Sequence, residues 1–373
     1  MNILILSWRD PRHPLAGGAE QSVLEHAKGW LDAGNNITWF SSRYKNSFKK
    51  ENFESIEIER GGNQYLGVQF AAFFHYLKNK NKIDLVIDQF HGLPFFTPLY
   101  VRKPKLALIQ EVAKKVWFLN PLPRPINWLV GLIGYLFEPL VLKLYRNVFF
   151  MTASMSARED IIKMGIDTEK ITVIPHGVTL PKKAVKSEKE KIKTITYLGI
   201  LSKDKGIEDA IKCFQILASR TNYQFWVIGQ GETKTYEEKI KKLAKSLGNK
   251  IIFWGFVSQQ RKFELLAKSH ILINPSIHEG WGLVNIEANC VGTPVVACNS
   301  AGLVDSVRNG ESGAIVENNT PEELAKAVVS ILDDERNYNA LIRGSTMWAD
   351  KFSWSESKQK SLDLVNRIIK NEI

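Results

Sequence analysis

Short apolar runs alternate with amphipathic segments along almost the whole chain. Residues 2–8 read NILILSW, a continuous apolar run typical of a strand buried on both faces of a parallel sheet. Residues 19–34 carry apolar positions at helical spacing and end at Gly34, which predicts a helix that stops there. The alternation continues through NITWFSS, SIEIERGGN, VQFAAFFHYLKNK, DLVIDQF, KLALIQEV, NVFFMTAS, SAREDIIKMGI and KITVIPHG. This order predicts a doubly wound α/β domain.

A polar, lysine-rich stretch interrupts the pattern at residues 179–194. It lacks apolar periodicity, which is typical of an interdomain linker. After it the alternation restarts with TITYLGIL and continues to PEELAKAVVSILDD. We therefore predict two α/β domains, residues 1–178 and 195–354, and expect a C-terminal helix at about 355–373 to pack back on the first. Ligands of open parallel sheets bind at the carboxyl ends of the strands, so the cleft between two such domains is the expected site.

Length and composition are those of an ordinary globular protein. The chain has 373 residues, enough for roughly two domains, with 44% hydrophobic and 24% charged residues. Its three cysteines, Cys213, Cys290 and Cys298, are too few and too irregularly spaced for a disulfide framework or a zinc site. The first residues lack the basic segment and the long apolar run of a signal peptide, so we expect a cytoplasmic protein.

The excess of positive charge is concentrated in one segment. The formal net charge is +11, and residues 101–150 contain eight basic and two acidic residues. Aromatic residues stand among these charges, namely Trp117, Phe118, Trp128, Tyr135 and Phe137. Basic and aromatic residues together favour an anionic membrane surface as the partner of residues 101–150. Nucleic acid also attracts basic patches, but the sequence contains no recognition motif for it, so we expect no nucleic-acid partner.

The apolar stretch at residues 126–151 admits three interpretations. Glu138-Pro139, Lys143 and Arg146 interrupt it, so its uninterrupted part is shorter than the roughly 20 residues of a membrane-spanning helix. It can be a buried helix before a strand, a helix lying in the membrane interface, or a membrane span. The span is the least favoured of the three.

Two turns that open helices carry glycines. Gly17-Gly18 precedes the first helix, and Gly280-Trp281-Gly282 precedes a helix expected from Leu283. Glycines before a helix allow backbone N–H groups to approach a phosphate, which the helix dipole also attracts. The alternative is a plain strand-to-helix loop that binds no ligand, which would have a similar sequence.

Two glutamates flank the second of these turns. Glu279 precedes Gly280 and Glu287 lies in the following helix, eight positions later. Carboxylates accept pairs of hydrogen bonds, so adjacent sugar hydroxyls are suitable partners. With N–H groups holding a diphosphate between them, the expected ligand is a sugar nucleotide. The alternative is a solvated pair of surface glutamates.

The segment HEGWGLVNIEANCVGTPVVA resembles the E-x7-E signature of the retaining glycosyltransferases of family 4, with Glu279 and Glu287 at the expected spacing. The segments LAGGAEQ, VIPHGV, YLGILSKDKGIEDAI, VIGQGE, FWGFVS, SAGLVDSVRNGESGAIVE and FSW resemble the family in the family's order. The resemblance covers nearly the whole chain. It implies the GT-B fold, in which two Rossmann-like doubly wound domains face each other across a cleft, with the acceptor on the N-terminal side and the nucleotide sugar in the C-terminal domain.

The resemblance also implies roles for the matching positions. Glu279 would hold hydroxyls of the donor sugar, Glu287 would hold the ribose, and Lys205 of KDKG would neutralise the departing diphosphate. The other expected donor-binding residues, acting at the diphosphate or near the base, are Gly17, Gly18, Phe256, Val257, Gly280, Trp281, Gly282 and Leu283. The family acts without metal or another cofactor, and the sequence has no Asp-x-Asp motif at a strand end.

Two positions depart from the family pattern. The family commonly has arginine where this chain has Ile200, and Lys203 is a candidate substitute for the missing cation, although it can equally be a solvated lysine. The family's histidine at the end of KLALIQEV is replaced by Gln110, and His91 in DQFHGLPFF is the replacement candidate. His91 can also be a loop histidine without a catalytic role. We expect His176, at a usual asparagine position, to be structural.

These observations predict a metal-independent, retaining hexosyltransferase. It would transfer a sugar from a UDP- or GDP-sugar to a lipid-linked or polysaccharide acceptor, as a peripheral protein on the cytoplasmic face of the cell membrane. The alternative is a non-catalytic nucleotide-sugar-binding subunit, which Ile200 and Gln110 would suit. A nicotinamide dehydrogenase is disfavoured because no strand-linked G-x-G-x-x-G with a following acidic residue is present.

Overall fold

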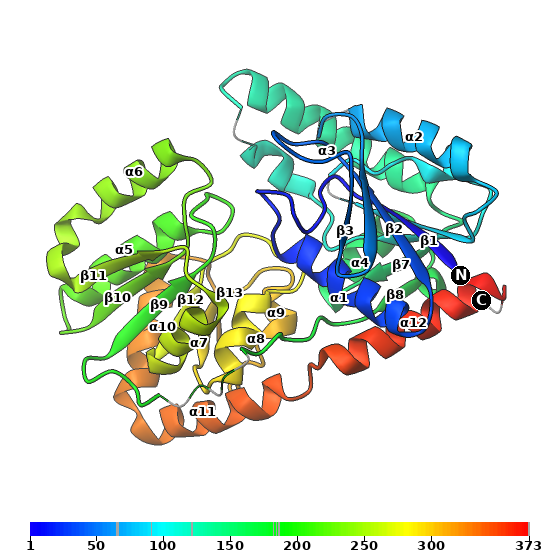
Figure 1. The fold of residues 1–373 in the computed structure, drawn as a ribbon. Helices are drawn as coiled ribbons and strands as arrows, with labels where there is room; N and C mark the ends of the chain where they lie inside the picture. The colour runs from blue at the N-terminus through cyan, green and yellow to red at the C-terminus, as the bar shows by residue number, and fades with distance from the viewer. Residues whose placement is uncertain are drawn as a thin grey trace. The chain divides into compact units, whose positions relative to one another are not determined.

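The computed structural model describes residues 1–64, 67–90, 92–120, 122–181, 183, 185 and 187–371. It consists of two compact units (Figure 1). Unit 1 contains Met1–Gly177 and Trp354–Ile373, and unit 2 contains Val178–Ser353. In each unit helices cover both faces of a largely parallel sheet, as in a Rossmann fold. This confirms the predicted fold class.

Unit 1 is built on a sheet with the strand order β3-β4-β2-β1-β5-β6-β7-β8. Its strands are β1 (Asn2–Leu6), β2 (Asn36–Ser41), β3 (Lys50–Phe53), β4 (Ile56–Arg60), β5 (Leu85–Gln89), β6 (Lys105–Leu108), β7 (Phe149–Thr152) and β8 (Ile171–Val173). All neighbouring pairs are parallel except β3 with β4. The central strand β1 pairs with β2 and β5, in register at Ile3 with Ile37 and Leu85.

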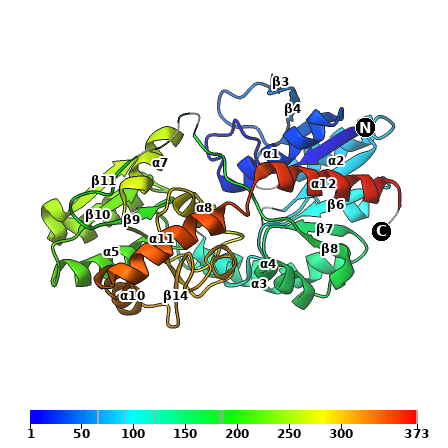
Figure 2. The ribbon, with the colours of Figure 1, turned by 90° about the horizontal axis from the view of Figure 1, so that it is seen from below.

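The helices of unit 1 cover both faces of this sheet. They are α1 (Gly18–Asp32), α2 (Gly67–Asn79), α3 (Ile126–Leu144), α4 (Met155–Lys163) and α12 (Trp354–Ile369), with short 3-10 helices η1 (Thr97–Leu99), η2 (Lys114–Leu119) and η3 (Thr168–Lys170). Figure 2 shows α12 lying alongside α1. The indole Nε1 of Trp30 on α1 donates to Ser361 Oγ of α12 at 3.2 Å, within a core shared with the sheet.

Unit 2 is built on a fully parallel sheet with the order β11-β10-β9-β12-β13-β14. Its strands are β9 (Thr194–Leu198), β10 (Gln224–Ile228), β11 (Ile251–Gly255), β12 (Ile271–Asn274), β13 (Val295–Cys298) and β14 (Gly313–Val316). Its helices are α5 (Ile207–Ala218), α6 (Lys234–Leu243), η4 (Ala244–Lys250), α7 (Gln259–Lys268), α8 (Leu283–Cys290), α9 (Leu303–Ser306), α10 (Pro321–Asp333) and α11 (Glu335–Ala349).

The segment expected as a linker is partly anchored to unit 2. Lys189 is half-buried, and its ammonium group donates to the backbone oxygens of Ser269 (2.6 Å) and Gly292 (3.1 Å) and to Thr293 Oγ1 (2.8 Å). The backbone N–H of Glu190 donates to the carbonyl of Lys268. The polar composition of this segment therefore does not keep all of it in solvent.

Two histidines lie in the interior of unit 1. The ring of His26 on α1 lies 5.9 Å from the ring of His176, and both rings contact Trp354. Nε2 of His176 donates to Oε1 of Gln110 at 2.7 Å, while neither ring nitrogen of His26 has a hydrogen-bond partner among the described residues. Burial lowers the pKa of both histidines to about 3, so both are neutral at pH 7.

Unit 1 is therefore expected to lose stability as the pH falls below about 6.5. The unfolded chain protonates these histidines near pH 6.5 and the folded chain only near pH 3, so each costs up to about 1.4 kcal/mol of unfolding free energy per pH unit in between. His176→Asn should remove about half of this pH-dependent loss. Urea unfolding of wild type and variant at pH 7.5, 6 and 5 measures it, and equal slopes for the two proteins would contradict the assignment.

Candidate functional site

Two strand-end loops of unit 2 meet at its carboxyl edge. The strands β9 and β12 are neighbours in the sheet, and each is followed by a loop that leads to a helix. Gly206, the N-cap of α5, has φ of 68°, and a Cβ on it would lie 2.3 Å from the carbonyl oxygen of Pro275. The N–H of Ile277 donates to the carbonyl of Asp204 at 2.9 Å. Glycine at position 206 thus allows the two loops to lock together.

Lys205 and Glu279 face each other where these loops meet. The ammonium Nζ of Lys205 lies 3.0 Å from Oε1 of Glu279, and Ser276 Oγ donates to the same oxygen at 3.1 Å. The two side chains keep 27% and 19% of their surface exposed, so both can reach a ligand. Beneath them, the buried hydroxyl of Tyr197 donates to the carbonyls of Ile200 (2.8 Å) and Lys205 (3.3 Å). Burial raises the pKa of Tyr197 well above its usual value, which keeps this donor protonated.

The glycine turn of the second loop packs against the rest of unit 2. Gly282 caps α8 with φ of 79°, and a Cβ there would lie 2.7 Å from Ser306 Oγ. Among the first N–H groups of α8, that of Asn285 donates to the carbonyl of Gly282 at 2.9 Å, whereas those of Leu283 and Val284 precede the first bonds of the helix. Gly280 and Trp281 are buried, and the indole of Trp281 meets Phe352 edge to face at 5.0 Å. The Trp281 side chain therefore positions the turn from inside, and only its backbone is available to a ligand.

Glu287 lies on α8 with a lysine partner that the sequence pattern did not reveal. Its Oε1 is 2.5 Å from the ammonium of Lys262 on α7, and both side chains are mostly buried. Lys262 follows the Ser258 N-cap of α7 by one helical turn. No local sequence motif indicates the pairing of Lys262 with Glu287, because the order of the strands in the sheet is what makes α7 and α8 neighbours.

The remaining donor-side residues lie at strand ends of the same sheet. Phe256 directly follows β11 and is 81% exposed, while Val257 packs partly on the cluster that contains Trp226. Ile200, after β9, is half-exposed, and Lys203 is exposed in the following loop. The structure thus brings Lys205, Glu279 and the start of α8 together, and places Phe256 two strands away at the edge of the sheet.

The glycine loop of unit 1 is capped by a buried glutamate. The N–H of Gly17 donates to Oε2 of Glu20 at 2.7 Å, and Glu20 Oε1 lies 3.5 Å from Nε of Arg9. α1 begins at Gly18. The N–H of Gly17, expected to bind phosphate, therefore has an acceptor inside unit 1. Glu20 would have to release it before Gly17 could bind a ligand.

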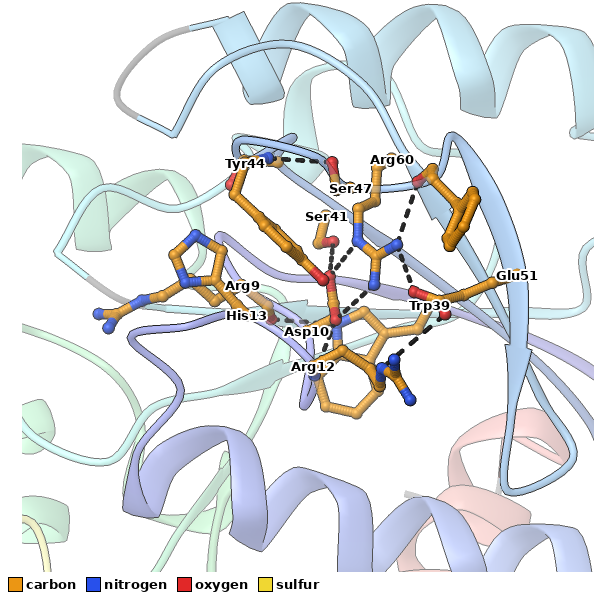
Figure 3. Close-up of polar contacts among 12 residues, drawn as sticks. Arg9, Asp10, Arg12, His13, Trp39, Ser41, Tyr44, Ser47, Glu51 and Arg60 are labelled. Atoms are coloured by element: carbon orange, nitrogen blue, oxygen red, sulfur yellow. Dashed lines mark hydrogen bonds and ion pairs between the residues drawn. The ribbon is translucent and has the colours of Figure 1, made fainter. Parts of the chain in front are cut away.

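A buried ion pair holds the loop between β1 and α1 (Figure 3). The guanidinium of Arg60 donates from Nε to Asp10 Oδ2 (2.6 Å) and from Nη2 to Asp10 Oδ1 (2.8 Å). Both side chains are fully buried. Ser41 Oγ also donates to Asp10, and Glu51 lies 2.6 Å from Nη1 of Arg60. Burial opposes ionisation, but these bonds keep the pKa of Asp10 below its usual value, so the pair remains charged.

Polar side chains also stand at the strand ends of unit 1. Gln110, after β6, donates from Nε2 to Ser22 Oγ at 3.2 Å and accepts from His176, as described above. Gln89, at the end of β5, is fully buried, and its amide has no hydrogen-bond partner among the described residues. His91 lies outside the described residues, so its expected catalytic role stays a prediction.

Unit 1 also exposes an extensive apolar surface. α3 is a continuous helix that includes Pro139, and among its residues only Gly131 and Leu142 are buried. The interpretation as a buried helix is therefore wrong. By length and composition α3 could cross a membrane. Its exposed apolar residues are Ile126, Trp128, Leu129, Leu132, Ile133, Tyr135, Leu136, Phe137, Leu140 and Leu144.

A second apolar stripe lies on α2, on the same side of unit 1 as α3 in Figure 1. Phe70, Phe74 and Leu77 are exposed at helical spacing. Leu99 of η1 is exposed as well, next to Tyr100, which packs on Phe73 of α2. The backbone N–H of Thr97 in η1 donates a hydrogen bond to the hydroxyl of Tyr145, the C-cap of α3. The η1 region therefore contacts both α2 and α3, the two helices with exposed apolar residues.

Two family sequence models match the chain one after the other. The model described as "Glycosyltransferase Family 4" matches residues 16–181, and the model described as "Glycosyl transferases group 1" matches residues 180–348. Together they span residues 16–348, which include most of each unit. Within the parts of the chain that the structure describes, no three His, Cys, Asp or Glu side chains are grouped as metal ligands would be.

Individual proteins are also similar to this chain. A capsular polysaccharide biosynthesis glycosyltransferase, CapM, of Staphylococcus aureus is 27% identical over 68% of this chain and 73% of its own. A D-inositol 3-phosphate glycosyltransferase of Acidothermus cellulolyticus is 29% identical over 54% of this chain, and the match spans 49% of that protein, about half its length. The crystal structure of Anabaena HepE with UDP-glucose has a TM-score of 0.74 at 17% identity, covering 98% of this chain and 99% of that one, which shows a shared fold.

Proposed function

This chain belongs to the group 1 and family 4 glycosyltransferases and has their GT-B fold, and we propose that it is a retaining hexosyltransferase that needs no metal. It transfers a sugar from a UDP- or GDP-sugar to a lipid-linked or polysaccharide acceptor. The observation that carries the proposal is the pair formed by Lys205 and Glu279, which is 3.0 Å apart, partly exposed and placed beside the N-termini of α5 and α8.

The charges of this pair match those of the reaction. Breaking the bond between sugar and phosphate places negative charge on the departing diphosphate and positive charge on the sugar ring. Lys205 and the first N–H groups of α8 stabilise the diphosphate, and Glu279 binds sugar hydroxyls beside the developing positive charge. Retention then comes from attack on the face that the diphosphate leaves. Lys262 keeps the carboxylate of Glu287 oriented for the ribose.

Names of similar proteins support the substrate classes. HepE was crystallised with UDP-glucose, and CapM is named for capsular polysaccharide biosynthesis. Phe256 offers an exposed ring on which the base of either nucleotide can stack. A thermal-shift screen with UDP, GDP, ADP and their sugars identifies the donor, because a ligand that binds the folded state raises the melting temperature.

A non-catalytic binding subunit remains the second candidate, and Ile200 favours it. This residue is half-exposed at the end of β9, where the family commonly has arginine. The transferase and the binding subunit differ in whether they turn over the nucleotide sugar that binds best. Turnover is measured in the presence of EDTA, with and without added acceptor. Release of the free nucleotide supports the transferase. Tight binding without release would favour the binding subunit, and activity that requires a divalent metal would contradict the metal-independent mechanism.

We also propose that unit 1 attaches to the cytoplasmic face of the cell membrane. The exposed apolar residues of α3 and α2 form the contact surface, within a chain region of excess positive charge. Residues 67–82 add three lysines and no acidic residue. An apolar helix face with basic neighbours suits an anionic lipid interface.

Reversing three charges around α3 should release the protein from anionic vesicles. Lys115, Arg124 and Lys143 are exposed, and each basic residue near the surface contributes about 1 kcal/mol to binding of anionic lipid. The triple change to glutamate is expected to abolish co-sedimentation with phosphatidylglycerol-containing vesicles. The matched control reverses Lys234, Lys242 and Lys245, which are exposed on unit 2, and should bind like wild type. Equal vesicle binding by both variants would remove the membrane proposal.

A further inference from the structure

Unit 1 contains an apolar cavity beneath α3. Its volume is about 190 Å³. Its wall on the side of α3 is formed by residues at helical spacing, Val130, Ile133, Gly134, Phe137 and Val141. On the opposite side lie Phe90 and Ile109, which directly follow β5 and β6, and Trp117 of η2.

The glycines of α3 bring η2 close to the helix. A Cβ on Gly134 would lie 2.3 Å from Cδ2 of Trp117, and one on Gly131 would lie 2.6 Å from Cδ1 of Phe118. Glu138 of α3 fixes the same contact, because its carboxylate accepts from the N–H groups of Ala113 (2.7 Å) and Lys114 (2.8 Å). These contacts hold η2 against α3 and so fix the wall of the cavity.

The cavity connects the apolar surface with the strand ends. Ile133 and Phe137 line it and are also 49% and 56% exposed, so it opens on the surface of α3. Gly92 and Leu93 also line the cavity, and the indole Nε1 of Trp8 donates to the carbonyl of Leu93 at 2.8 Å. Trp8 lies in the loop that follows β1, and the lining residues Phe90 and Ile109 follow β5 and β6. The cavity therefore extends to the carboxyl edge of the sheet, where the acceptor is expected.

We propose that this cavity binds the apolar chain of a lipid-linked acceptor, next to the group that receives the sugar. The inference rests on the proposed glycosyltransferase function and selects the lipid-linked class of acceptor. Apolar walls offer water few partners, and dry cavities of about 150 Å³ bind apolar molecules in other proteins. This cavity, at about 190 Å³, is of similar size.

The charged residues of the wall determine which part of the lipid enters. Among the described residues of the lining, Glu111 and Glu138 are the charged ones. Burial raises the pKa of Glu138, and its carboxylate is engaged with the backbone. The described lining offers a phosphate two carboxyl groups and no basic side chain, so a phosphate is disfavoured in this space. The anionic head therefore stays outside the cavity, at the strand ends, and an uncharged chain fills it.

Binding of decyl phosphate to the full-length protein, below its micelle concentration and without vesicles, tests the proposal. Methyl phosphate is the control without a chain. Decyl phosphate should bind about 100-fold more tightly or better, because each buried methylene contributes favourably. Affinity across ethyl, butyl, hexyl, octyl and decyl phosphate should rise with chain length. An affinity that does not rise with chain length would overturn the proposal.

Two neighbouring residues of α3 give a matched pair of variants. Val130 lines the cavity, whereas Leu129 is 60% exposed and does not. Val130→Phe should weaken decyl phosphate binding about tenfold or more by filling the cavity, while Leu129→Phe should leave it unchanged. Equal effects of both variants would indicate adsorption to the outer surface of α3 and overturn the assignment. Failure of the proposed function would appear separately, in the nucleotide-sugar screen, because the readout here is lipid binding alone.

Discussion

Replacing Lys205 by alanine is expected to lower kcat by about 10²–10³ while leaving the protein folded. This is the loss typical when one preorganised group that stabilises developing charge is removed, about 2.7–4 kcal/mol of barrier. The loss should fall on kcat more than on donor binding, because the diphosphate gains negative charge as the bond breaks. Without Lys205, the carboxylate of Glu279 also loses the cation 3.0 Å away and repels the diphosphate.

Stability should change little in the same variant. Lys205 and Glu279 are both partly exposed, and such pairs contribute roughly 0–1 kcal/mol. Melting temperature and steady-state kinetics together separate the two effects.

Lys203→Ala is the matched control, because Lys203 is an exposed lysine two residues away whose loss should leave kcat close to wild type. A Lys205→Ala variant with near wild-type turnover would refute its role. If Lys203→Ala carried the loss instead, Lys203 would be the cation that replaces the family's arginine.

Replacing Arg60 by alanine is expected to destabilise unit 1 by about 3–5 kcal/mol, which is the cost of leaving a buried charge without its partner. Asp10 would lose both bonds to the guanidinium in a place without access to water. The loop from β1 to Gly17 would lose its anchor as well, since Asp10 also accepts from the N–H of Arg12. Urea unfolding followed by circular dichroism measures the change.

Arg12→Ala is the control for this variant. Arg12 lies 3.8 Å from Glu51 and its side chain is half-exposed, so its removal should cost at most about 1 kcal/mol. An Arg60→Ala protein that unfolds at the same urea concentration as Arg12→Ala would show that the buried pair does not hold the loop.

Periodicity of apolar residues was sufficient to predict the order of most strands and helices. Buried strands such as β1 and β12 are short apolar runs, and helices such as α5 repeat apolar residues every three to four positions. The short strand β3, with the sequence KENF at the sheet edge, carries too little apolar pattern to be recognised. Glutamate and proline at 138–139 suggest that the apolar stretch is interrupted and short. In the structure Glu138 accepts from the N–H of Lys114 in η2, and α3 continues through Pro139 for 19 residues.

The candidate site was predicted through resemblance more than through local pattern. Lys205 and Glu279 are distant in sequence, and they meet because β9 and β12 are neighbours in the sheet. Local periodicity does not determine the order of strands in a sheet. The ion pair between Lys262 and Glu287, which depends on that order, therefore cannot be predicted from it. The burial of the Trp281 side chain also cannot be predicted from the sequence, since an aromatic residue in a glycine turn can point into the domain or into solvent.

A crystal structure with the nucleotide sugar that most raises the melting temperature tests the central claim most directly. We predict that the diphosphate lies at the carboxyl ends of β9 and β12. A phosphate oxygen should be within about 2.7–3.2 Å of Lys205 Nζ, and a sugar hydroxyl at a similar distance from Glu279. Density for the nucleotide sugar away from these two loops, with the Lys205–Glu279 pair undisturbed, would contradict the account.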